Sequence, residues 1–142
     1  MSSAYISPTR RQLVAERAKH RCEYCQTQEL VVGMTLEIEH IIPEVAGGSS
    51  DESNLCLACP SCNRYKGRRT NAVDEETGDT VSLFHPRQQK WQAHFSWEQN
   101  GLYLVGLTPS GRATIAALQM NNPFIVRSRR AWIAAGWHPP QD

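Results

Sequence analysis

The most regular alternation of apolar and polar residues in this chain lies in Met34 to Glu39, which reads MTLEIE. A period of two residues is typical of a half-buried β-strand, and it puts the threonine and both glutamates on one face. A loop with a proline and a Gly-Gly pair follows, and Asn54 to Ala58 is apolar enough to return as a second short strand. Pro60 to Gly67 begins with proline and ends with glycine, as a short helix often does. The pattern therefore predicts strand, loop, strand and helix in succession.

Elements are also expected on both sides of this unit. Ser7-Pro8 marks a helix start, because serine caps the first turn and proline fits the first helical position. Downstream, Val81 to Phe84 is expected to be a short strand. Asn100-Gly101 then separates two strand-like runs, Gln92 to Trp97 and Leu102 to Leu107. An Asn-Gly pair between two such runs is a strong signal for a β-hairpin.

Two helices are expected at the C-terminal end. Thr108-Pro109 begins one that runs to about Met120, and Asn122-Pro123 begins another that ends near Gly136. The four tryptophans of the chain could stack on nucleic-acid bases. A hairpin and two helices need a core, however, so packing is the preferred interpretation of these side chains.

The fold class that follows from these elements is α+β. The 142 residues allow one domain of ordinary size, so residues 1–142 are expected to form a single domain. Within it, the strand, loop, strand and helix unit occupies residues 20–70. Residues 80–140 form a C-terminal extension of hairpin and helices that is expected to buttress this unit.

Overall charge gives no argument for a nucleic-acid partner, because the formal net charge is only +1. Basic residues nevertheless gather in residues 10–21, 64–69 and 127–130. No apolar run approaches the roughly 20 residues that span a bilayer, so no membrane association is expected. The N-terminus lacks the apolar region of a signal peptide, and a cytoplasmic protein is therefore expected.

Five cysteines in such a chain indicate reduced thiols that bind a metal rather than a disulfide framework. Cys22 with Cys25 and Cys59 with Cys62 form two Cys-x-x-Cys pairs, which together supply the four sulfur ligands of a structural Zn²⁺ ion. Cys56 overlaps the second pair, but it alternates with leucines and is expected to be a buried apolar side chain. A thioredoxin-like redox role would need a βαβ pattern, which neither pair shows.

His40 stands at the end of the first predicted strand and is not needed as a zinc ligand. A lone histidine beside a zinc knuckle could simply cap a turn. Glu39, Asn54 and Asn63 lie in register with it, however, and this combination favours a catalytic interpretation.

The stretch from Cys22 to about Arg69 resembles the HNH endonuclease family in its zinc-bearing His-Asn-Asn variant, whose fold is the ββα-metal finger. The tail, with LFHPR, HFSW, GLTPSGRAT and GWHPP, resembles a tail found on many small bacterial HNH proteins. The motifs that carry the first resemblance are Glu39-His40-Ile-Ile-Pro43, Gly47-Gly48, Asn54-Leu55 and Cys59-Pro-Ser-Cys62-Asn63-Arg-x-Lys66.

The resemblance implies a role for each of the matching residues. His40 is implied to be the general base that takes a proton from water, a role that suits an imidazole because this group titrates near neutrality. Asn54 is implied to position the loop and, through its backbone carbonyl, the tautomer of His40. Glu39 and Asn63 are implied to hold one divalent cation beside the phosphate.

Oxygen donors from Glu39 and Asn63 suit Mg²⁺ or Mn²⁺ better than Zn²⁺, so the catalytic ion is expected to be magnesium-like. Many members of the family carry aspartate at the position of Glu39. The longer side chain of glutamate could move the ion, and it leaves Glu37 as a competing ligand.

The expected activity is hydrolysis of phosphodiester bonds in DNA. A monomer with one active site would nick the duplex, whereas a homodimer would present two sites. The alternative is a zinc-stabilised module that binds nucleic acid or another partner without catalysis. Backbone contacts to DNA are expected from the basic residues that follow the second cysteine pair, namely Arg64, Lys66, Arg68 and Arg69.

Overall fold

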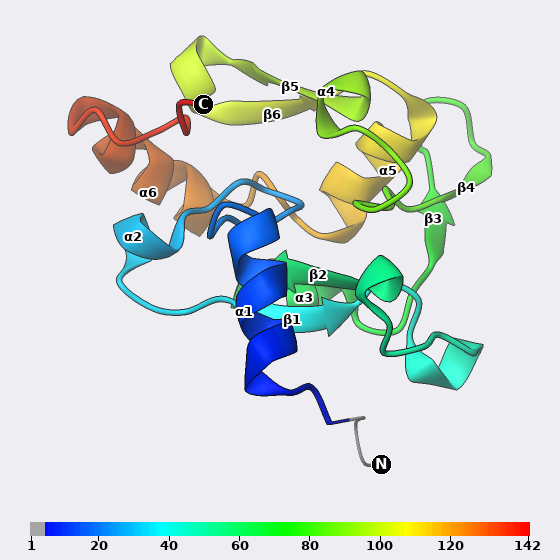
Figure 1. The fold of residues 1–142 in the computed structure, drawn as a ribbon. Helices are drawn as coiled ribbons and strands as arrows, with labels where there is room; N and C mark the ends of the chain where they lie inside the picture. Colours follow the sequence, from blue (N-terminus) through cyan, green and yellow to red (C-terminus); the bar gives the residue numbers. More distant parts are fainter. Residues whose placement is uncertain (1–4) are drawn as a thin grey trace.

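The computed structural model describes residues 5–142 of the chain. Helices and short antiparallel strand pairs alternate within this range, which confirms the α+β class (Figure 1). None of the helices in residues 5–142 is long and apolar enough to cross a bilayer. In chain order the elements are α1 (Pro8–Arg17), α2 (Glu29–Val32), β1 (Glu37–His40), η1 (Glu44–Ala46), η2 (Glu52–Asn54), β2 (Leu55–Ala58), α3 (Pro60–Lys66), β3 (Asn71–Val73), β4 (Thr80–Ser82), α4 (Trp91–His94), β5 (Phe95–Glu98), η3 (Gln99–Gly101), β6 (Tyr103–Gly106), α5 (Pro109–Ala117) and α6 (Pro123–Ala134), where η marks a 3-10 helix.

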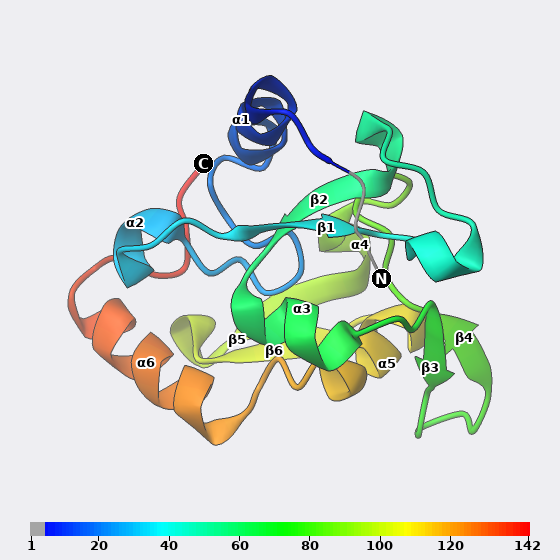
Figure 2. The ribbon, with the colours of Figure 1, turned by 90° about the horizontal axis from the view of Figure 1, so that it is seen from below.

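The expected strand, loop, strand and helix unit is present as β1, β2 and α3. β1 pairs with β2 in antiparallel register, from Glu37 opposite Ala58 to His40 opposite Leu55. β1 begins later than the sequence predicted, because the Leu36 backbone N–H bonds to the Glu29 side chain at 2.8 Å instead of joining the ladder. Figure 2 shows α1 on one side of this two-stranded ribbon and α3 on the other. The two faces of the ribbon therefore meet different helices.

The predicted helix starts are confirmed, and three of them have the capping contact that their Ser, Thr or Asn suggested. The side chain of Ser7 accepts a hydrogen bond from the backbone of the first turn of α1. The side chains of Thr108 and Asn122 do the same for α5 and α6, and proline occupies the first turn of all three helices. These side chains satisfy backbone N–H groups that have no partner inside the helix.

The C-terminal extension differs from the prediction at its first strands. The hairpin around Asn100-Gly101 is present, with β5 paired to β6, but Gln92 to His94 belong to α4 rather than to the strand. The strand expected at Val81 to Phe84 ends at Ser82 as β4, since Leu83 and Phe84 turn into the core with 5% and 2% exposure. The Leu83 backbone N–H still bonds to the Thr70 carbonyl at 3.0 Å, so the pairing of the two segments continues one residue beyond β4.

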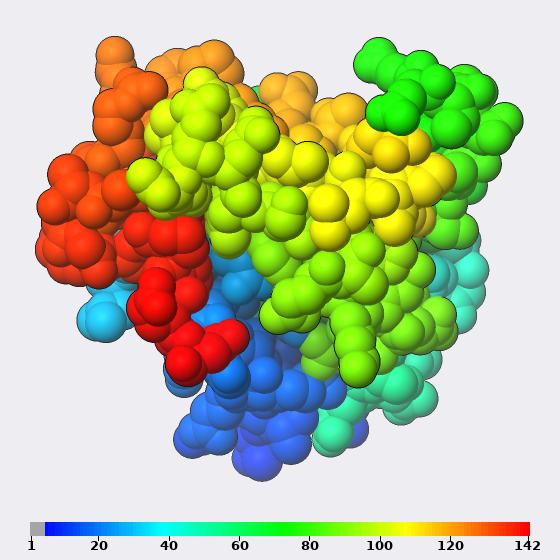
Figure 3. All heavy atoms as spheres, turned by 90° about the horizontal axis from the view of Figure 1, so that it is seen from above, coloured from blue at the N-terminus to red at the C-terminus, as the bar shows by residue number. Residues whose placement is uncertain are grey.

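The hydrophobic core runs through both the ribbon unit and the extension. One cluster of buried residues reaches from Ile6 and Val14 near the N-terminus to Met120 beyond α5, and it includes the paired cysteines. Three of the tryptophans are partly buried, as expected for packing, whereas Trp137 is 58% exposed. The final residues return to the N-terminal part of the chain (Figure 3), where the Asp142 side chain lies 2.8 Å from Arg21.

Candidate active site and zinc centre

Four buried sulfur atoms form the one group of potential metal ligands found in residues 5–142. The Sγ atoms of the two Cys-x-x-Cys pairs all lie within 4.8 Å of one another, and those of Cys25 and Cys59 are 3.7 Å apart. Four sulfurs bound to one zinc at about 2.3 Å in a tetrahedron would be separated by about 3.8 Å. The donor set and its dimensions therefore fit a structural zinc ion. The cluster consists of Cys22, Cys25, Cys59 and Cys62.

Backbone geometry brings each cysteine pair to one point. In the first knuckle the N–H of Cys25 bonds to Cys22 Sγ, and in the second the N–H of Cys62 bonds to Cys59 Sγ, both at 3.4 Å. Cys59 is also the N-cap of α3, so the helix start itself turns the second pair toward the first. Cys56 is fully buried in β2 and lies outside the cluster, as predicted.

His40 ends β1, and its ring is held by a residue that the sequence interpretation missed. Nε2 of the half-buried imidazole lies 2.9 Å from Ser50 Oγ. The backbone carbonyl of Ser50 in turn accepts a hydrogen bond from Arg10 Nη1 of α1 at 2.8 Å. The loop after β1 and the first helix thus fix the orientation of the candidate base. Spacing alone gave no signal for this contact, because Ser50 lies in a run of polar loop residues.

Asn54 braces the loop that carries Ser50. Its side-chain oxygen accepts from the Ile42 N–H at 2.8 Å, and its amide nitrogen donates to the carbonyls of Ile42 and Ser49 at 2.9 and 2.7 Å. Gly48 is needed here because an added Cβ would lie 1.8 Å from the Ile42 carbonyl oxygen. The Asn54 backbone carbonyl accepts from the Ile41 N–H at 2.8 Å. That carbonyl therefore holds the end of β1. The His40 ring is held by Ser50 and not, as the resemblance implied, by the Asn54 carbonyl.

Glu39 lies in a buried polar cluster on the α3 side of the ribbon. It is 5% exposed, and its Oε1 accepts a hydrogen bond from the Tyr24 hydroxyl at 2.9 Å. Its Oε2 lies 3.4 Å from the ammonium of Lys66, which is itself 1% exposed and donates to the Ile41 carbonyl at 2.8 Å. Burial raises the pKa of Glu39, whereas the Lys66 charge and the Tyr24 hydroxyl act to lower it. Lys66 therefore neutralises this carboxylate in the interior.

Lys66 requires a correction of the predicted DNA-binding set, because its buried ammonium cannot reach a phosphate on the surface. Arg64 and Arg68 are exposed, as the prediction requires. Arg69 is exposed as well, but its guanidinium also donates to the Ala117 carbonyl at 2.9 Å. It therefore ties α3 to the C-terminal extension.

Glu39 and Asn63 do not share a contact in this structure. The Asn63 amide donates instead to Oε1 of Glu37 at 2.7 Å, on the exposed part of the same strand face. His40 lies three positions along β1 from Glu37, a span of about 10 Å at a rise of about 3.3 Å per residue. The oxygen donors suit a hard divalent cation, but the Lys66 ammonium stands beside the carboxylate that the resemblance implied as its ligand.

The zinc cluster predicts different outcomes for neighbouring cysteines of β2 and α3. Cys59→Ala should lose bound zinc and the cooperative unfolding transition, because the ion contributes folding free energy directly. Cys56→Ala should retain one zinc per chain and lose only about 1 kcal/mol of stability. Metal analysis after gel filtration, combined with urea unfolding, measures both. Zinc loss in Cys56→Ala would contradict the ligand assignment.

The buried pair predicts a pH-dependent loss of stability. At pH 8, Lys66→Met should lower the free energy of unfolding by about 3–5 kcal/mol, because Glu39 is left buried without its cation. A carboxyl whose folded-state pKa is raised binds its proton more tightly when folded, so stability falls as pH rises through that pKa. The deficit of Lys66→Met relative to the unsubstituted protein should therefore shrink between pH 8 and pH 6. The double variant Glu39→Gln/Lys66→Met is the control and should lack this pH dependence, while an equal deficit at both pH values in Lys66→Met would contradict the assignment.

Comparison with known proteins places this site in a family. Residues 22–69 match the family model described as HNH endonuclease, a range that includes both cysteine pairs, His40 and Asn54. No curated protein and no solved structure matches the chain. An HNH nuclease domain implies a nucleic-acid substrate. Residues 22–69 of this protein therefore match an HNH endonuclease domain, with a four-cysteine cluster compatible with its zinc-bearing variant.

Proposed function

We propose that this protein hydrolyses phosphodiester bonds in DNA and that His40 is the general base. The observation that carries the proposal is the position of the imidazole. It ends β1 half-buried, held by Ser50 at 2.9 Å, beside a loop that Asn54 braces with three side-chain hydrogen bonds. A ring held in this way and still partly open to solvent is suited to take a proton from water.

The proposed step begins with water beside His40. When Nε2 donates its hydrogen to Ser50 Oγ, Nδ1 carries the lone pair, because a neutral imidazole has one N–H. Nδ1 takes a proton from the water as its oxygen forms a bond to phosphorus. The bond from phosphorus to the 3′ oxygen breaks, and that oxygen leaves with the electron pair and is protonated from solvent. The products are a 5′-phosphate and a 3′-hydroxyl.

A divalent cation, when bound, would stabilise negative charge on the phosphate and the leaving oxygen. Glu39 and Asn63 are the proposed ligands, because the resemblance to the family implies them and each side chain offers an oxygen donor. Binding at Glu39 requires the Lys66 ammonium to leave the carboxylate from which it is now 3.4 Å distant.

The proposed contacts to DNA come from exposed arginines of α3 and the residues after it. Arg64 and Arg68 would bind phosphates without reading the base sequence, with Arg69 contributing alongside its contact to Ala117. A monomer is the default form of the proposal, and with one His40 it would nick the duplex.

Substitution of His40 tests the proposed hydrolysis. In Mg²⁺ or Mn²⁺ the zinc-loaded protein should relax supercoiled plasmid, and His40→Ala should lower the rate by at least about 100-fold, because a general base contributes that much or more. His20→Ala is the matched control, since this exposed histidine pairs with Glu29 on α2 and should leave the rate unchanged. Equal cutting by His40→Ala would contradict the assignment of the base.

A second candidate function is a zinc-stabilised module that binds nucleic acid without cutting it. The observation that favours it is the ion pair of Glu39 with Lys66, because the Lys66 ammonium occupies the place beside Glu39 where the divalent cation would bind. This function predicts plasmid retardation without relaxation, both for the unsubstituted protein and for His40→Ala.

Cation binding can be measured apart from activity by titrating Mn²⁺ into the zinc-loaded protein. Glu39→Gln and Asn63→Ala should each weaken Mn²⁺ binding by about tenfold or more, because each removes one of few oxygen ligands. Glu75→Gln is the matched control, because this exposed carboxylate lies between β3 and β4, and it should bind Mn²⁺ as the unsubstituted protein does. Weakening by Glu37→Gln with normal binding by Glu39→Gln would place the ion away from His40. No binding by the unsubstituted protein would favour the second function.

A further inference from the structure

The C-terminal extension encloses the four-cysteine cluster, beginning at the first knuckle. Trp91 of α4 donates from its indole nitrogen to the Tyr24 carbonyl at 2.8 Å, and Arg87 forms an ion pair with Glu23. Glu23 and Tyr24 are the two residues between the first pair of cysteines. Two side chains of the extension therefore bind the backbone and side chain of this knuckle directly.

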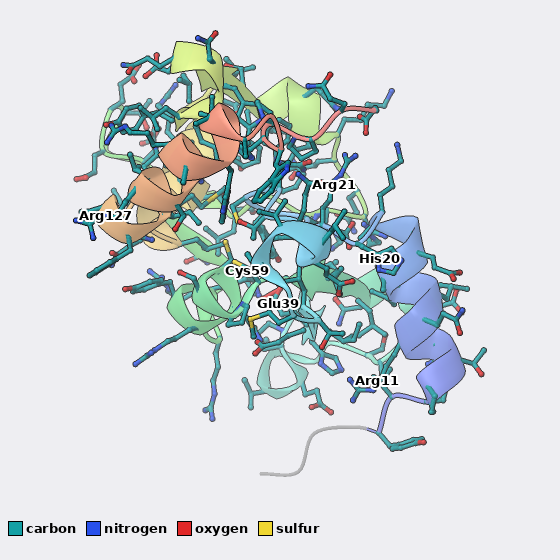
Figure 4. The ribbon with its side chains drawn as sticks, turned by 90° about the vertical axis from the view of Figure 1, so that its left-hand side faces the viewer. Arg11, His20, Arg21, Glu39, Cys59 and Arg127 are labelled. Atoms are coloured by element: carbon teal, nitrogen blue, oxygen red, sulfur yellow. The ribbon has the colours of Figure 1, made fainter. Side chains whose placement is uncertain are left out.

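The second knuckle is covered by the turn between α5 and α6. Leu118, Met120 and Asn122 of this turn, with Ile125 of α6, line a cavity together with three of the cysteines. Its volume is about 20 Å³, enough for about one water molecule. Figure 4 shows α6, on which Arg127 is labelled, on the side of the molecule where Cys59 lies. The turn therefore covers the cluster on this side, where the lining cysteines are at most 6% exposed.

Arg129 of α6 holds this turn from inside the protein. The residue is 0% exposed, and its Nη2 donates to the Met120 carbonyl at 2.6 Å. Nη1 donates to the side chain of Asn121 at 3.0 Å and to the Leu102 carbonyl at 3.2 Å. The guanidinium carbon lies 5.1 Å from the ring centroid of Trp97, and Nε has no hydrogen-bond partner.

The hydrogen-bond partners of Arg129 are neutral oxygens, so no carboxylate of residues 5–142 balances its positive charge. Backbone and amide oxygens satisfy part of the guanidinium, but none of the ion pairs found in residues 5–142 includes it. A fully buried arginine is rare unless a negative charge compensates it. Met120, whose carbonyl accepts from Arg129, lines the same cavity as Cys25, Cys59 and Cys62, so the guanidinium lies behind the turn that covers the cluster. Burial lowers the pKa of Arg129, and the charges of the cysteines oppose this effect.

A tetrathiolate zinc centre would supply the missing negative charge, because Zn²⁺ with four thiolates has a net charge of −2. The knuckle N–H groups compensate part of this charge through their bonds to Cys22 and Cys59. We propose that Arg129 is the compensating cation of this centre and that the C-terminal extension serves to retain the zinc. The proposal concerns zinc retention and stands whether or not the domain cuts DNA.

The full-length protein, loaded with Zn²⁺ or with Co²⁺ as a spectroscopic probe, provides the test. Arg129→Met should shift the sulfur-to-cobalt charge-transfer band to longer wavelength, because sulfur electrons are held less tightly without the cation. It should also accelerate zinc transfer to a chelator and alkylation of the thiolates on the order of tenfold, the size of one charge interaction in a partly screened interior.

Three further variants separate charge from structure. Arg129→Lys keeps a cation and should retain the band position, even if its lost hydrogen bonds lower stability. Asn121→Ala removes a partner of Arg129 and of Leu104 without changing charge, so it should lower stability and leave the band in place. Arg127→Met removes an exposed arginine from the same helix and should change neither property.

The decisive comparison is between variants that remove the charge of Arg129 and variants that only lower stability. An unchanged band and unchanged alkylation in Arg129→Met would show that Arg129 only supports the turn, and the proposal would be wrong. If Arg129→Met does not fold, Arg129→Lys and Asn121→Ala still decide: equal band shifts in these two variants would trace the effect to the turn and contradict a role for the charge.

Discussion

Convergence of four cysteine sulfurs is the constraint on which the rest of the structure depends. The two knuckles come from distant parts of the sequence, and bringing them within bonding distance of one ion fixes where β2 ends and α3 begins. α3 then lies along one face of the two-stranded ribbon, while α1 lies along the other. In a protein of this size, such a crosslink can replace apolar area that a short ribbon and helix could not bury by themselves.

The geometry around the ribbon separates two kinds of polar site. On the α1 side, His40 is held by Ser50, and the loop between the strands is held by Asn54, so the candidate base is oriented without being buried. On the α3 side, Glu39 and Lys66 form a neutralised pair in the interior. Two adjacent residues of one strand thus have opposite environments, because successive side chains of a strand point to opposite faces.

The extension and the domain it covers are joined by more than apolar packing. Arg87 and Trp91 bind the first knuckle, Arg69 binds the end of α5, and the turn held by Arg129 closes over the second knuckle. The core is continuous across these contacts. A perturbation of the extension should therefore reach the metal centre before it reaches the loop of His40.

Local features of the sequence determined the elements and the metal cluster, because their physical causes lie within a few residues. Ser7, Thr108 and Asn122 predict helix starts, because each caps a helix within its own first turn. The Cys-x-x-Cys spacing likewise brings two sulfurs to one metal ion without help from distant residues. The resemblance carried by the stretch after Cys22 likewise located the domain that the family comparison found.

Only the tertiary structure decided which side chain each polar group meets. The pairing of Glu39 with Lys66 depends on how α3 lies across β1, and the Ser50 contact depends on how the loop folds back on the ribbon. Arg129 belongs to the basic cluster at residues 127–130, yet packing of α6 buried it completely. Spacing along a chain specifies local geometry, whereas burial and charge pairing arise between segments that the sequence does not place next to one another.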